Sequence, residues 1–332
     1  MKKIVVVGFG FMGLTHTINI LHSKNLELTA IIDRDIDFIE NSLMSKAGNI
    51  SIGNLNSERL RNVRKYSDLD ACMKSEDFDA VVICVPTSFH FEMTRKVLSY
   101  GKHVFLEKPI CLDISQAEYL IDLAQKKSRI FMVGHVVRFM PPYQKLKKWA
   151  ETFEFGNLKF LSLHRFSGRP GWGQWTEKSV ADSSGGALFD LVIHDIDFAN
   201  YLFGIPDCIE STCLPGSLSR HDYISAMWKY GRKDVHVSIE GGNRFHINLP
   251  FQAGYMAQFE KASMLYTTLK GNVICIADDK SIREVPSGDA TTGYFNELIY
   301  FTDCMEYNSQ PAECMPVSSL EAIKLCYKHI NK

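Results

Sequence analysis

The 332-residue sequence lacks an excess of charge: 37 lysine and arginine residues nearly balance 38 aspartate and glutamate residues, and the net charge is −1. It also lacks blocks of like charge, low-complexity tracts and internal repeats. Because nucleic acids and anionic membranes attract clustered positive charge, this balance argues against both as partners. No apolar stretch approaches the ~20 residues that cross a bilayer, so we expect no membrane-spanning segment.

Cysteine pairs that are typical of metal or redox motifs are also missing. The sequence has nine cysteines but no Cys-x-x-Cys, and Cys84, Cys275 and Cys326 lie in apolar contexts. These features favour buried, reduced thiols of a cytoplasmic protein over disulfides or a zinc site, and we expect no metal. Residues 1–13 have the basic start and apolar run of a signal peptide, but three glycines interrupt the run and no small-residue cleavage site follows.

Over residues 1–133 the sequence alternates β-type and α-type segments. Strands are expected at residues 3–7, 26–32, 63–66, 80–85, 103–106 and 129–133, and helices at 68–74, 88–100 and 113–126. Strict alternation predicts an α/β Rossmann domain with a doubly wound parallel sheet. Ligands bind such a sheet at the carboxyl ends of its strands. After the fourth and fifth strands, this rule selects as cofactor contacts Cys84, Pro86, Thr87, His90, Glu107 and Lys108.

A glycine-rich loop follows the first strand directly. Strand, G-x-G-x-x-G, helix, second strand and a terminal acid form the arrangement that binds dinucleotides. Gly8 permits a tight turn, Gly10 lets the backbone approach a pyrophosphate at the helix N-terminus, and Gly13 allows helix and strand to pack closely. The predicted cofactor contacts in this loop are Gly8, Phe9, Gly10, Phe11, Met12 and Gly13.

Asp33 ends the second strand and supplies the terminal acid. Its carboxylate would accept hydrogen bonds from the adenosine ribose hydroxyls and repel a 2′-phosphate, which favours NAD as the cofactor. Arg34, the next residue, leaves NADP open. Asp33 could also serve as the N-cap of a helix over residues 35–45.

Lys108 lies in the segment Glu107-Lys108-Pro109, just beyond a buried strand at the expected ligand-binding edge. A lysine in this place can donate a hydrogen bond to a hydroxyl or carbonyl oxygen of a substrate. The alternative is an ordinary loop lysine that is paired with Glu107. Because cis peptides occur mainly at X–Pro bonds, the Lys108–Pro109 bond is a candidate for the cis form.

A second candidate group is the segment Asp190-Leu-Val-Ile-His194, which follows Gly185-Gly186. Residues four apart on a helix share one face, so Asp190 and His194 can act as a carboxylate–imidazole pair. Imidazole titrates near neutral pH, which suits acid–base catalysis. From the residues alone, His194 could equally be a core histidine and Asp190 a surface charge.

Residues 134–332 predict a second, α+β domain with a large, mainly antiparallel open sheet. The helix expected at 318–330 is a candidate to pack back on the first domain. Near residue 170, a loop rich in arginine and tryptophan suits sugar or phosphate binding by stacking and forked hydrogen bonds, although a packed surface loop would look the same. The expected strands are 159–164, 223–230, 235–240, 255–261, 263–269 and 272–277, and the helices are 143–152, 187–202, 294–306 and 318–330.

The sequence resembles, over nearly its whole length, the glucose–fructose oxidoreductase/inositol dehydrogenase/rhizopine catabolism (Gfo/Idh/MocA) family. The most specific motif is the Glu-Lys-Pro signature after a Rossmann unit, followed by an Asp-x-x-x-His helix. Arg138-Phe139 also matches the family pattern, but Met140 stands where the family often has asparagine. The segments that carry the resemblance are 8–13, 85–90, 101–109, 134–139 and 185–197.

The resemblance implies that Lys108, Asp190 and His194 form the catalytic group, and that Pro86 and His90 line the cofactor site. It implies hydride transfer between nicotinamide and a carbon that bears a hydroxyl group of a sugar, inositol or related polyol. It also implies a homodimer or homotetramer formed through the second sheet. With the arginine and tryptophan positions added, the candidate substrate contacts are Lys108, Arg138, Arg165, Trp172, Asp190 and His194.

In this interpretation His194 takes the hydroxyl proton, Asp190 orients the imidazole, and Lys108 stabilises the negative oxygen. The roles of His194 and Lys108 could be exchanged. Two other enzyme types stay open: a sugar or nucleotide-sugar reductase, and a redox-assisted glycosidase with tightly bound cofactor. A non-catalytic nucleotide-binding regulatory or scaffold protein is the alternative from another class, but it would not need all three groups.

Overall fold

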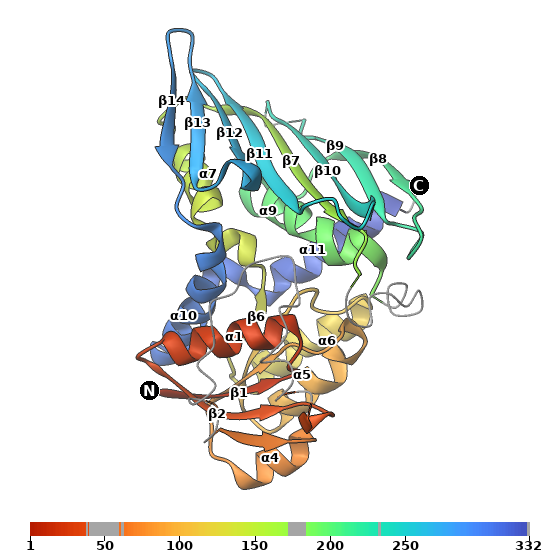
Figure 1. Ribbon diagram of the computed structural model, residues 1–332, viewed down its shortest axis with the longest axis vertical. Helices are drawn as coiled ribbons and strands as arrows, with labels where there is room; N and C mark the ends of the chain where they lie inside the picture. Colours follow the sequence, from red (N-terminus) through yellow and green to blue (C-terminus); the bar gives the residue numbers. More distant parts are fainter. Residues whose placement is uncertain (38, 40–59, 61–62, 172–183, 232–233, 331–332) are drawn as a thin grey trace. The chain divides into compact units, whose positions relative to one another are not determined.

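The computed structural model describes residues 1–37, 39, 60, 63–171, 184–231 and 234–330. The chain forms two compact units, each with its own sheet (Figure 1). The first unit contains Met1–His135 and Tyr294–Leu320, and the second contains Val136–Gly293 and Glu321–Lys332. In the described part of the chain, no helix combines the length and the apolar character needed to span a membrane.

A six-stranded parallel sheet forms the centre of the first unit, in the order β3-β2-β1-β4-β5-β6. Ile4, Val81 and Val104 on its central strands are fully buried, as expected for parallel strands that are covered on both faces. The strand order reverses between β1 and β4, where a doubly wound sheet binds its ligands. The predicted Rossmann fold is confirmed. The strands are β1 (Lys2–Val7), β2 (Leu26–Ile32), β3 (Arg64–Tyr66), β4 (Ala80–Ile83), β5 (His103–Glu107) and β6 (Phe131–Gly134).

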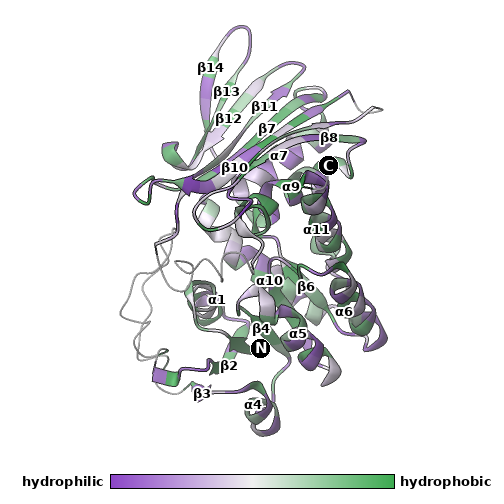
Figure 2. Ribbon diagram, turned by 90° about the vertical axis from the view of Figure 1, so that its right-hand side faces the viewer, coloured by the Kyte–Doolittle hydropathy of each residue, from purple (hydrophilic) through white to green (hydrophobic). Residues whose placement is uncertain are grey.

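The helices of the first unit pack apolar stripes against this sheet. In α6, Ala117, Leu120 and Ala124 recur at helical spacing and are buried, and Figure 2 shows hydrophobic and hydrophilic residues alternating along this helix. The N-cap of α6 is Asp113, whose side chain accepts from the Gln116 N–H at 3.0 Å. The helices are α1 (Phe11–His22), α4 (Leu69–Ser75), α5 (His90–Ser99) and α6 (Ile114–Lys126), with a 3₁₀ turn at Thr87–Phe89.

A helix from near the end of the chain also belongs to the first unit. In α10 (Gly293–Glu306), Phe301 packs edge-on against Phe105 of β5, with ring centroids 5.7 Å apart. The following 3₁₀ helix, Ala312–Cys314, is tied to β6, because the Cys314 thiol donates to the Val133 carbonyl at 3.0 Å. The division of the structure therefore differs from the sequence-based boundary at residue 134. A strand–helix pattern does not show which earlier strand a returning helix covers.

The last helix, α11 (Pro316–Ile330), belongs to both units. Near its start, the Ser319 hydroxyl lies 2.8 Å from His135 Nε2, within the first unit. Near its end, the buried His329 ring accepts from the Trp228 indole N–H at 3.0 Å, within the second. Only the first residues of this helix therefore belong to the first unit, and the rest belong to the second.

An eight-stranded sheet forms the second unit, in the order β14-β13-β12-β11-β7-β10-β9-β8. Strands β7 and β10 pair in parallel, and the other neighbouring pairs in this sheet are antiparallel. The predicted, mainly antiparallel sheet is confirmed. The strands are β7 (Leu158–Gly168), β8 (Cys208–Leu214), β9 (Tyr223–Lys229), β10 (His236–Phe245), β11 (Gln252–Phe259), β12 (Ser263–Thr267), β13 (Val273–Ala277) and β14 (Ile282–Pro286).

The helices of the second unit meet the sheet around the buried ring of Tyr143. This ring lies 5.1 Å from Phe198, 5.5 Å from Tyr255 and 5.9 Å from Tyr266, measured between centroids. Aromatic pairs at such spacing stabilise a core beyond the area that they bury, so this cluster fixes α7 and α9 on the sheet. The helical elements are a 3₁₀ helix at Val136–Phe139, α7 (Pro141–Thr152), a π-helix at Leu188–Val192, α9 (Ile193–Phe203), and 3₁₀ turns at Thr268–Lys270 and Ala290–Thr292.

Candidate functional site

Of the three glycines in the loop between β1 and α1, only Gly10 has open space where a side chain would stand. A Cβ atom on Gly13 would lie 1.9 Å from the Gly8 carbonyl oxygen, and Gly8 itself has a φ of +85°. At Gly10, by contrast, no atom lies within 4 Å of such a Cβ atom. Gly10 is also the N-cap of α1, with no side-chain hydrogen bond to the cap. Open space therefore lies beside the N-cap of α1, and the N-terminus of a helix favours an anion.

We expect Gly10→Ala to weaken NADH binding at least about tenfold, or about 1.4 kcal/mol, with an unchanged melting temperature. The methyl group enters the open space, and the backbone tolerates it because φ is −68°. Gly13→Ala is the contrast, since its methyl group collides with backbone and should cost about 1–3 kcal/mol of unfolding free energy or more. Fluorescence titration and thermal unfolding measure the two effects. Unchanged NADH affinity in Gly10→Ala would contradict a diphosphate at this loop.

Asp33 lies at the carboxyl end of β2 and supports the glycine loop. Its Oδ2 accepts the Phe9 N–H at 2.8 Å, and its Oδ1 accepts the Asp35 N–H at 3.1 Å. A carboxylate has about four lone-pair sites, so acceptor capacity is left for ribose hydroxyls. The Phe9 side chain is fully buried, so only its backbone can serve a ligand. Arg34 is exposed, with its guanidinium 5.5 Å from the centroid of the Phe89 ring.

The buried ring of His90 joins the segments that follow β4 and β5. Its Nδ1 lies 2.6 Å from the Pro109 carbonyl oxygen, and its Nε2 lies 2.9 Å from the Val85 carbonyl oxygen. Burial lowers the pKa of His90, against the opposing effect of these two carbonyl groups. His90 therefore fixes two ligand-binding segments, while its predicted contact with the cofactor stays a prediction. Of the other predicted contacts after β4, Pro86 is exposed, and Cys84 and Thr87 are half-buried.

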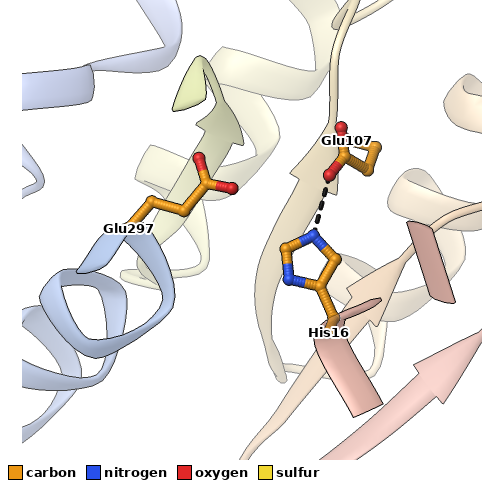
Figure 3. A group of neighbouring side chains, drawn as sticks. All are labelled: His16, Glu107 and Glu297. Carbon is orange, nitrogen blue, oxygen red and sulfur yellow. Dashed lines mark hydrogen bonds and ion pairs between the residues drawn. The ribbon is translucent and has the colours of Figure 1, made fainter. Parts of the chain in front are cut away.

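Lys108 is half-buried directly after β5, and the Lys108–Pro109 peptide is cis, which confirms the sequence-based candidate. Glu107 is buried, and its Oε1 lies 2.7 Å from His16 Nε2 of α1. Its Oε2 accepts the backbone N–H of Lys108 at 3.2 Å. Sequence reasoning missed His16, although its place on α1, just past the glycine loop, was a usable signal. Figure 3 shows this pair with Glu297 of α10 opposite.

Asp190 and His194 lie on a helix, as predicted, but the helix changes type between them. Asp190 is within the π-helix Leu188–Val192, and His194 is in the first turn of α9. Both side chains are half-buried. Short π-helical turns recur at functional sites, and the sequence pattern contains no signal for one. The structure places Lys108 in the first unit and both of these residues in the second, so their joint action stays a prediction.

Two buried ion pairs anchor the helix that carries His194. Arg138 donates from Nε to Asp197 Oδ2 at 2.8 Å and from Nη2 to Asp197 Oδ1 at 2.5 Å. Arg165 of β7 donates from Nε and Nη2 to the two oxygens of Asp195, both at 3.0 Å. The two arginines are each 4% exposed. Both arginines were predicted to contact substrate, and the structure shows carboxylate partners for them, so that role stays a prediction.

The loop that was predicted to bind sugar or phosphate is described only in part. Trp172 and Trp175 lie outside the described residues. Before them, Arg169 lines an open pocket of about 1530 Å³ in the second unit, together with Phe166, Tyr223 and Phe245. Neither Asp190 nor His194 lines this pocket.

Two family descriptions match separate parts of the sequence. "Oxidoreductase family, NAD-binding Rossmann fold" matches residues 2–135, and "GFO/IDH/MocA C-terminal domain" matches residues 143–264. Together they cover most of the chain.

Named relatives and a solved structure agree with these matches. The chain is 28% identical to D-glucoside 3-dehydrogenase of Escherichia coli (strain K12) over 207 residues, which are 61% of this chain and 54% of the relative. It therefore spans about half the length of that relative. It is 28% identical to scyllo-inositol 2-dehydrogenase (NAD(+)) of Bacillus subtilis (strain 168) over 321 residues, 93% and 87% of the two chains. A dehydrogenase structure from Chromobacterium violaceum shares the fold, with a TM-score of 0.80, 21% identity, and coverage of 98% and 93%.

Proposed function

The chain belongs to the Gfo/Idh/MocA family of oxidoreductases, and on that premise we propose that it is an NAD(P)-dependent dehydrogenase. Its proposed reaction is the reversible oxidation of a secondary alcohol on a sugar, inositol or related polyol. The observation that carries the proposal is the glycine loop, where Gly10 is open and α1 begins without a side-chain cap. Relatives named for a glucoside and for scyllo-inositol support the substrate class.

The residues of the first unit fit a nicotinamide dinucleotide. The loop offers an anion site at the start of α1, and Asp33 offers a carboxylate with acceptor capacity for ribose hydroxyls. When bound, the nicotinamide supplies the hydride chemistry. We propose that residues 8–13 hold the diphosphate and that Asp33 holds the adenosine ribose.

The protein's own part of the reaction is acid–base and electrostatic. We propose that His194 takes the proton of the substrate hydroxyl, because an imidazole exchanges protons readily near neutral pH. Asp190 would orient this imidazole and stabilise its charged form. Lys108 would donate a hydrogen bond to the same substrate oxygen and stabilise the negative charge that develops there. The hydrogen bond from the Lys108 N–H to Glu107 and the contact of the His90 ring with the Pro109 carbonyl would hold Lys108 in position.

We expect Asp33→Ala to weaken NAD binding far more than NADP binding, because the variant loses both a partner of the ribose hydroxyls and the repulsion of a 2′-phosphate. Asp33→Asn is the matched control, since its amide oxygen can still accept the Phe9 N–H that supports the loop. Titration of parent and variants with NADH and NADPH measures the effect. Equal affinity of the parent protein for both cofactors would contradict the NAD preference.

We propose that the protein self-associates through its large sheet. Along β11 and β12, buried residues alternate with exposed ones, and the exposed set includes Met256 and Leu265, which are 48% and 37% exposed. Exposed apolar side chains on an open sheet face favour association. Sedimentation would show a dimer or tetramer, and a monomer would contradict this proposal.

The experiment that tests the proposed function is an NADH titration followed by a panel of sugars, inositols and polyols with NAD and NADP. Turnover of any of these with NAD or NADP supports a dehydrogenase. Cofactor binding without turnover on any substrate would favour the non-catalytic alternative. Nicotinamide that stays bound through purification would favour the redox-assisted alternative.

A further inference from the structure

The His16–Glu107–Glu297 cluster places two carboxyl groups together inside the first unit. His16 and Glu297 are 0% exposed and Glu107 is 6% exposed. Each side chain has one atom, a ring nitrogen or a carboxylate oxygen, that lies within 4.8 Å of the corresponding atoms of the other two. Two ionised carboxylates at this spacing in a buried place repel each other strongly. Something positive must therefore lie between them: a proton or a metal cation.

The hydrogen bonds of the cluster leave Glu297 as the group without a partner. His16 Nε2 lies 2.7 Å from Glu107 Oε1, and an ionised Glu107 can only accept in this hydrogen bond, from an Nε2–H of the imidazole. Among the described residues, neither oxygen of Glu297 has a hydrogen-bond partner, and neither does His16 Nδ1. An ionised Glu297 would be a buried charge with no donor at all, which is costly. A protonated Glu297 has an O–H group that can donate a hydrogen bond, and Glu107 and His16 Nδ1 can accept one.

The surroundings of Glu297 also favour its neutral form. The Phe105 ring packs edge-on against both His16 and Phe301, at centroid distances of 5.0 Å and 5.7 Å. A Cβ atom on Gly134 would lie 3.6 Å from Glu297 Oε2, so β6 brings only backbone there. Burial raises the pKa of Glu297 well above its usual range, and the charge of Glu107 adds to this effect.

Two neighbouring titratable groups, Cys84 and His90, supply no positive charge to the cluster. At the end of β4, burial raises the pKa of the Cys84 thiol, with the charges of Glu107 and Glu297 adding to it, so this group stays neutral. On α5, burial lowers the pKa of His90, whose ring nitrogens face carbonyl oxygens rather than the cluster. Lys108 follows Glu107 and is half-buried.

A metal ion fits the observed spacing less well than a proton. Two ligands at about 2.0–2.2 Å from a tetrahedral zinc ion lie roughly 3.4 Å apart. The His16 and Glu107 atoms are closer than that, at the 2.7 Å spacing of a hydrogen bond. The spacing of this pair therefore fits a hydrogen bond better than a shared zinc ion.

We propose that Glu297 is a positioning residue: it stays protonated at neutral pH, directs its carboxyl proton toward Glu107, and so fixes the Glu107–Pro109 segment that carries Lys108. Glu107 accepts from the Lys108 backbone N–H and lies at hydrogen-bond distance from His16. In this proposal the cluster holds one net negative charge, on Glu107, and the proton of Glu297 is directed toward it. The proposal that Glu297 is protonated is independent of the proposed dehydrogenase activity. The proposal that this proton positions Lys108 for catalysis rests on that activity.

The buried proton makes the stability of the protein depend on pH in a defined direction. Glu297 binds its proton more tightly in the folded state than in the unfolded state, where its pKa is near 4.5. The folded state is therefore favoured fully below pH 4.5, and this contribution is lost as pH rises toward the folded-state pKa. One proton changes the unfolding constant by up to about tenfold per pH unit in this range.

The test compares parent protein, Glu297→Gln and Glu306→Gln by denaturant unfolding of the cofactor-free protein between pH 5 and 8. Glutamine cannot ionise but keeps a donor for Glu107, so the unfolding constant of the parent should rise relative to Glu297→Gln by up to about tenfold per pH unit. Glu306 is an exposed carboxyl on the same helix, and its variant should keep the parental slope. Equal slopes in the parent and Glu297→Gln would overturn the proposal.

A second measurement covers the case in which Glu297→Gln does not fold. The infrared spectrum of the folded parent protein at pH 7 should contain the carbonyl band of a buried, protonated carboxylic acid that does not shift on raising the pH to 8. Absence of that band would overturn the proposal. So would a melting temperature that rises with Zn²⁺ or Mn²⁺ in the parent and in Glu306→Gln but not in Glu297→Gln, because that result would assign the cluster to a metal.

The positioning role has its own readout. Glu297→Gln should keep turnover close to that of the parent at pH 7, whereas Glu297→Leu, which has no donor, should lower turnover with cofactor affinity largely kept. Equal turnover in the two variants would overturn the positioning role. If the parent turns over no substrate, the proposed function fails, and the unfolding and infrared measurements still decide whether Glu297 holds the proton.

Discussion

His194→Ala and Lys108→Ala are each expected to lower turnover by about 10²-fold or more, while NADH affinity is largely kept. A positioned acid–base group contributes about 10²–10⁴-fold to a rate, and a donor to a developing negative oxygen contributes on a similar scale. Neither side chain is part of the glycine loop that we propose for the diphosphate. Steady-state kinetics on a substrate from the polyol panel, with NADH titration of the same samples, separates the two effects.

His236→Ala and Lys126→Ala are the matched controls, because both side chains are exposed and lie outside the proposed site. Both controls should turn over substrate at the parental rate. Near-normal turnover in His194→Ala or in Lys108→Ala would refute the catalytic role of that residue. A pH–rate profile of the parent and of Lys108→Ala would then show which residue accepts the proton, since the two roles are exchangeable in the sequence-based interpretation.

Asp197→Ala is expected to lower the free energy of unfolding by about 3–5 kcal/mol, because it leaves the charge of Arg138 buried without its carboxylate partner. The side chains of Arg138 and Asp197 are 2% and 0% exposed, so water cannot replace the lost bonds. The double variant Arg138→Met/Asp197→Leu removes both charges and should recover most of the lost stability. Denaturant unfolding of the single and double variants measures the difference.

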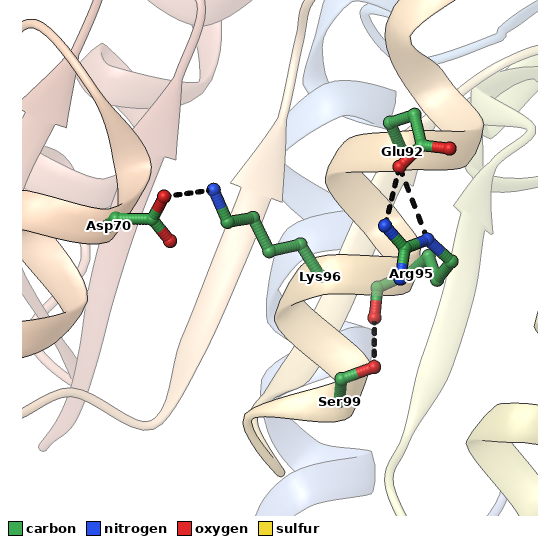
Figure 4. A network of polar contacts seen from close by, with 5 residues as sticks. All are labelled: Asp70, Glu92, Arg95, Lys96 and Ser99. Atoms are coloured by element: carbon green, nitrogen blue, oxygen red, sulfur yellow. Dashed lines mark hydrogen bonds and ion pairs between the residues drawn. The ribbon is translucent and has the colours of Figure 1, made fainter.

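The matched control is the exposed pair of Glu92 and Arg95 on α5 (Figure 4). Arg95 donates from Nε and Nη2 to Glu92 Oε2 at 3.2 Å and 2.7 Å, but the two side chains are 43% and 60% exposed. Exposed pairs contribute about 0–1 kcal/mol, so Glu92→Ala should change stability little. A loss from Asp197→Ala no greater than that from Glu92→Ala would contradict the anchoring role of the Arg138–Asp197 pair.

Inner strands were predictable from the sequence because their residues are buried on both faces or alternate strictly. The prediction for β2 matches its observed bounds, Leu26–Ile32. Strands β8 and β14, the two edges of the second sheet, were not predicted. An edge strand pairs on one side only, and the residues of β8 alternate between exposed and half-buried. Its hydrophobic signal is therefore too weak to separate it from a loop.

The candidate site was predictable where one short segment carries the chemistry. The glycine loop, Asp33 and Lys108 each follow a strand, and the strand-end rule finds all of them. The partners of Arg138 and Arg165 were not predictable, because Asp195 and Asp197 are distant in sequence and nothing in a charge pattern pairs them. Glu297 was missed for the same reason, since α10 returns to the first unit from near the end of the chain.

The parallel pairing of β7 with β10 has a consequence for how the second unit folds. Strand β7 has two neighbours in the sheet, β10 and β11, and both follow it only after the long segment that contains α9. A nascent chain that ends before His236 therefore presents both sides of β7 unpaired, which is a hazard for aggregation. Contacts between such distant segments form slowly. Synthesis must therefore pass Phe259, the end of β11, before both neighbours of β7 are available, and chaperone demand should fall on chains that end before that residue.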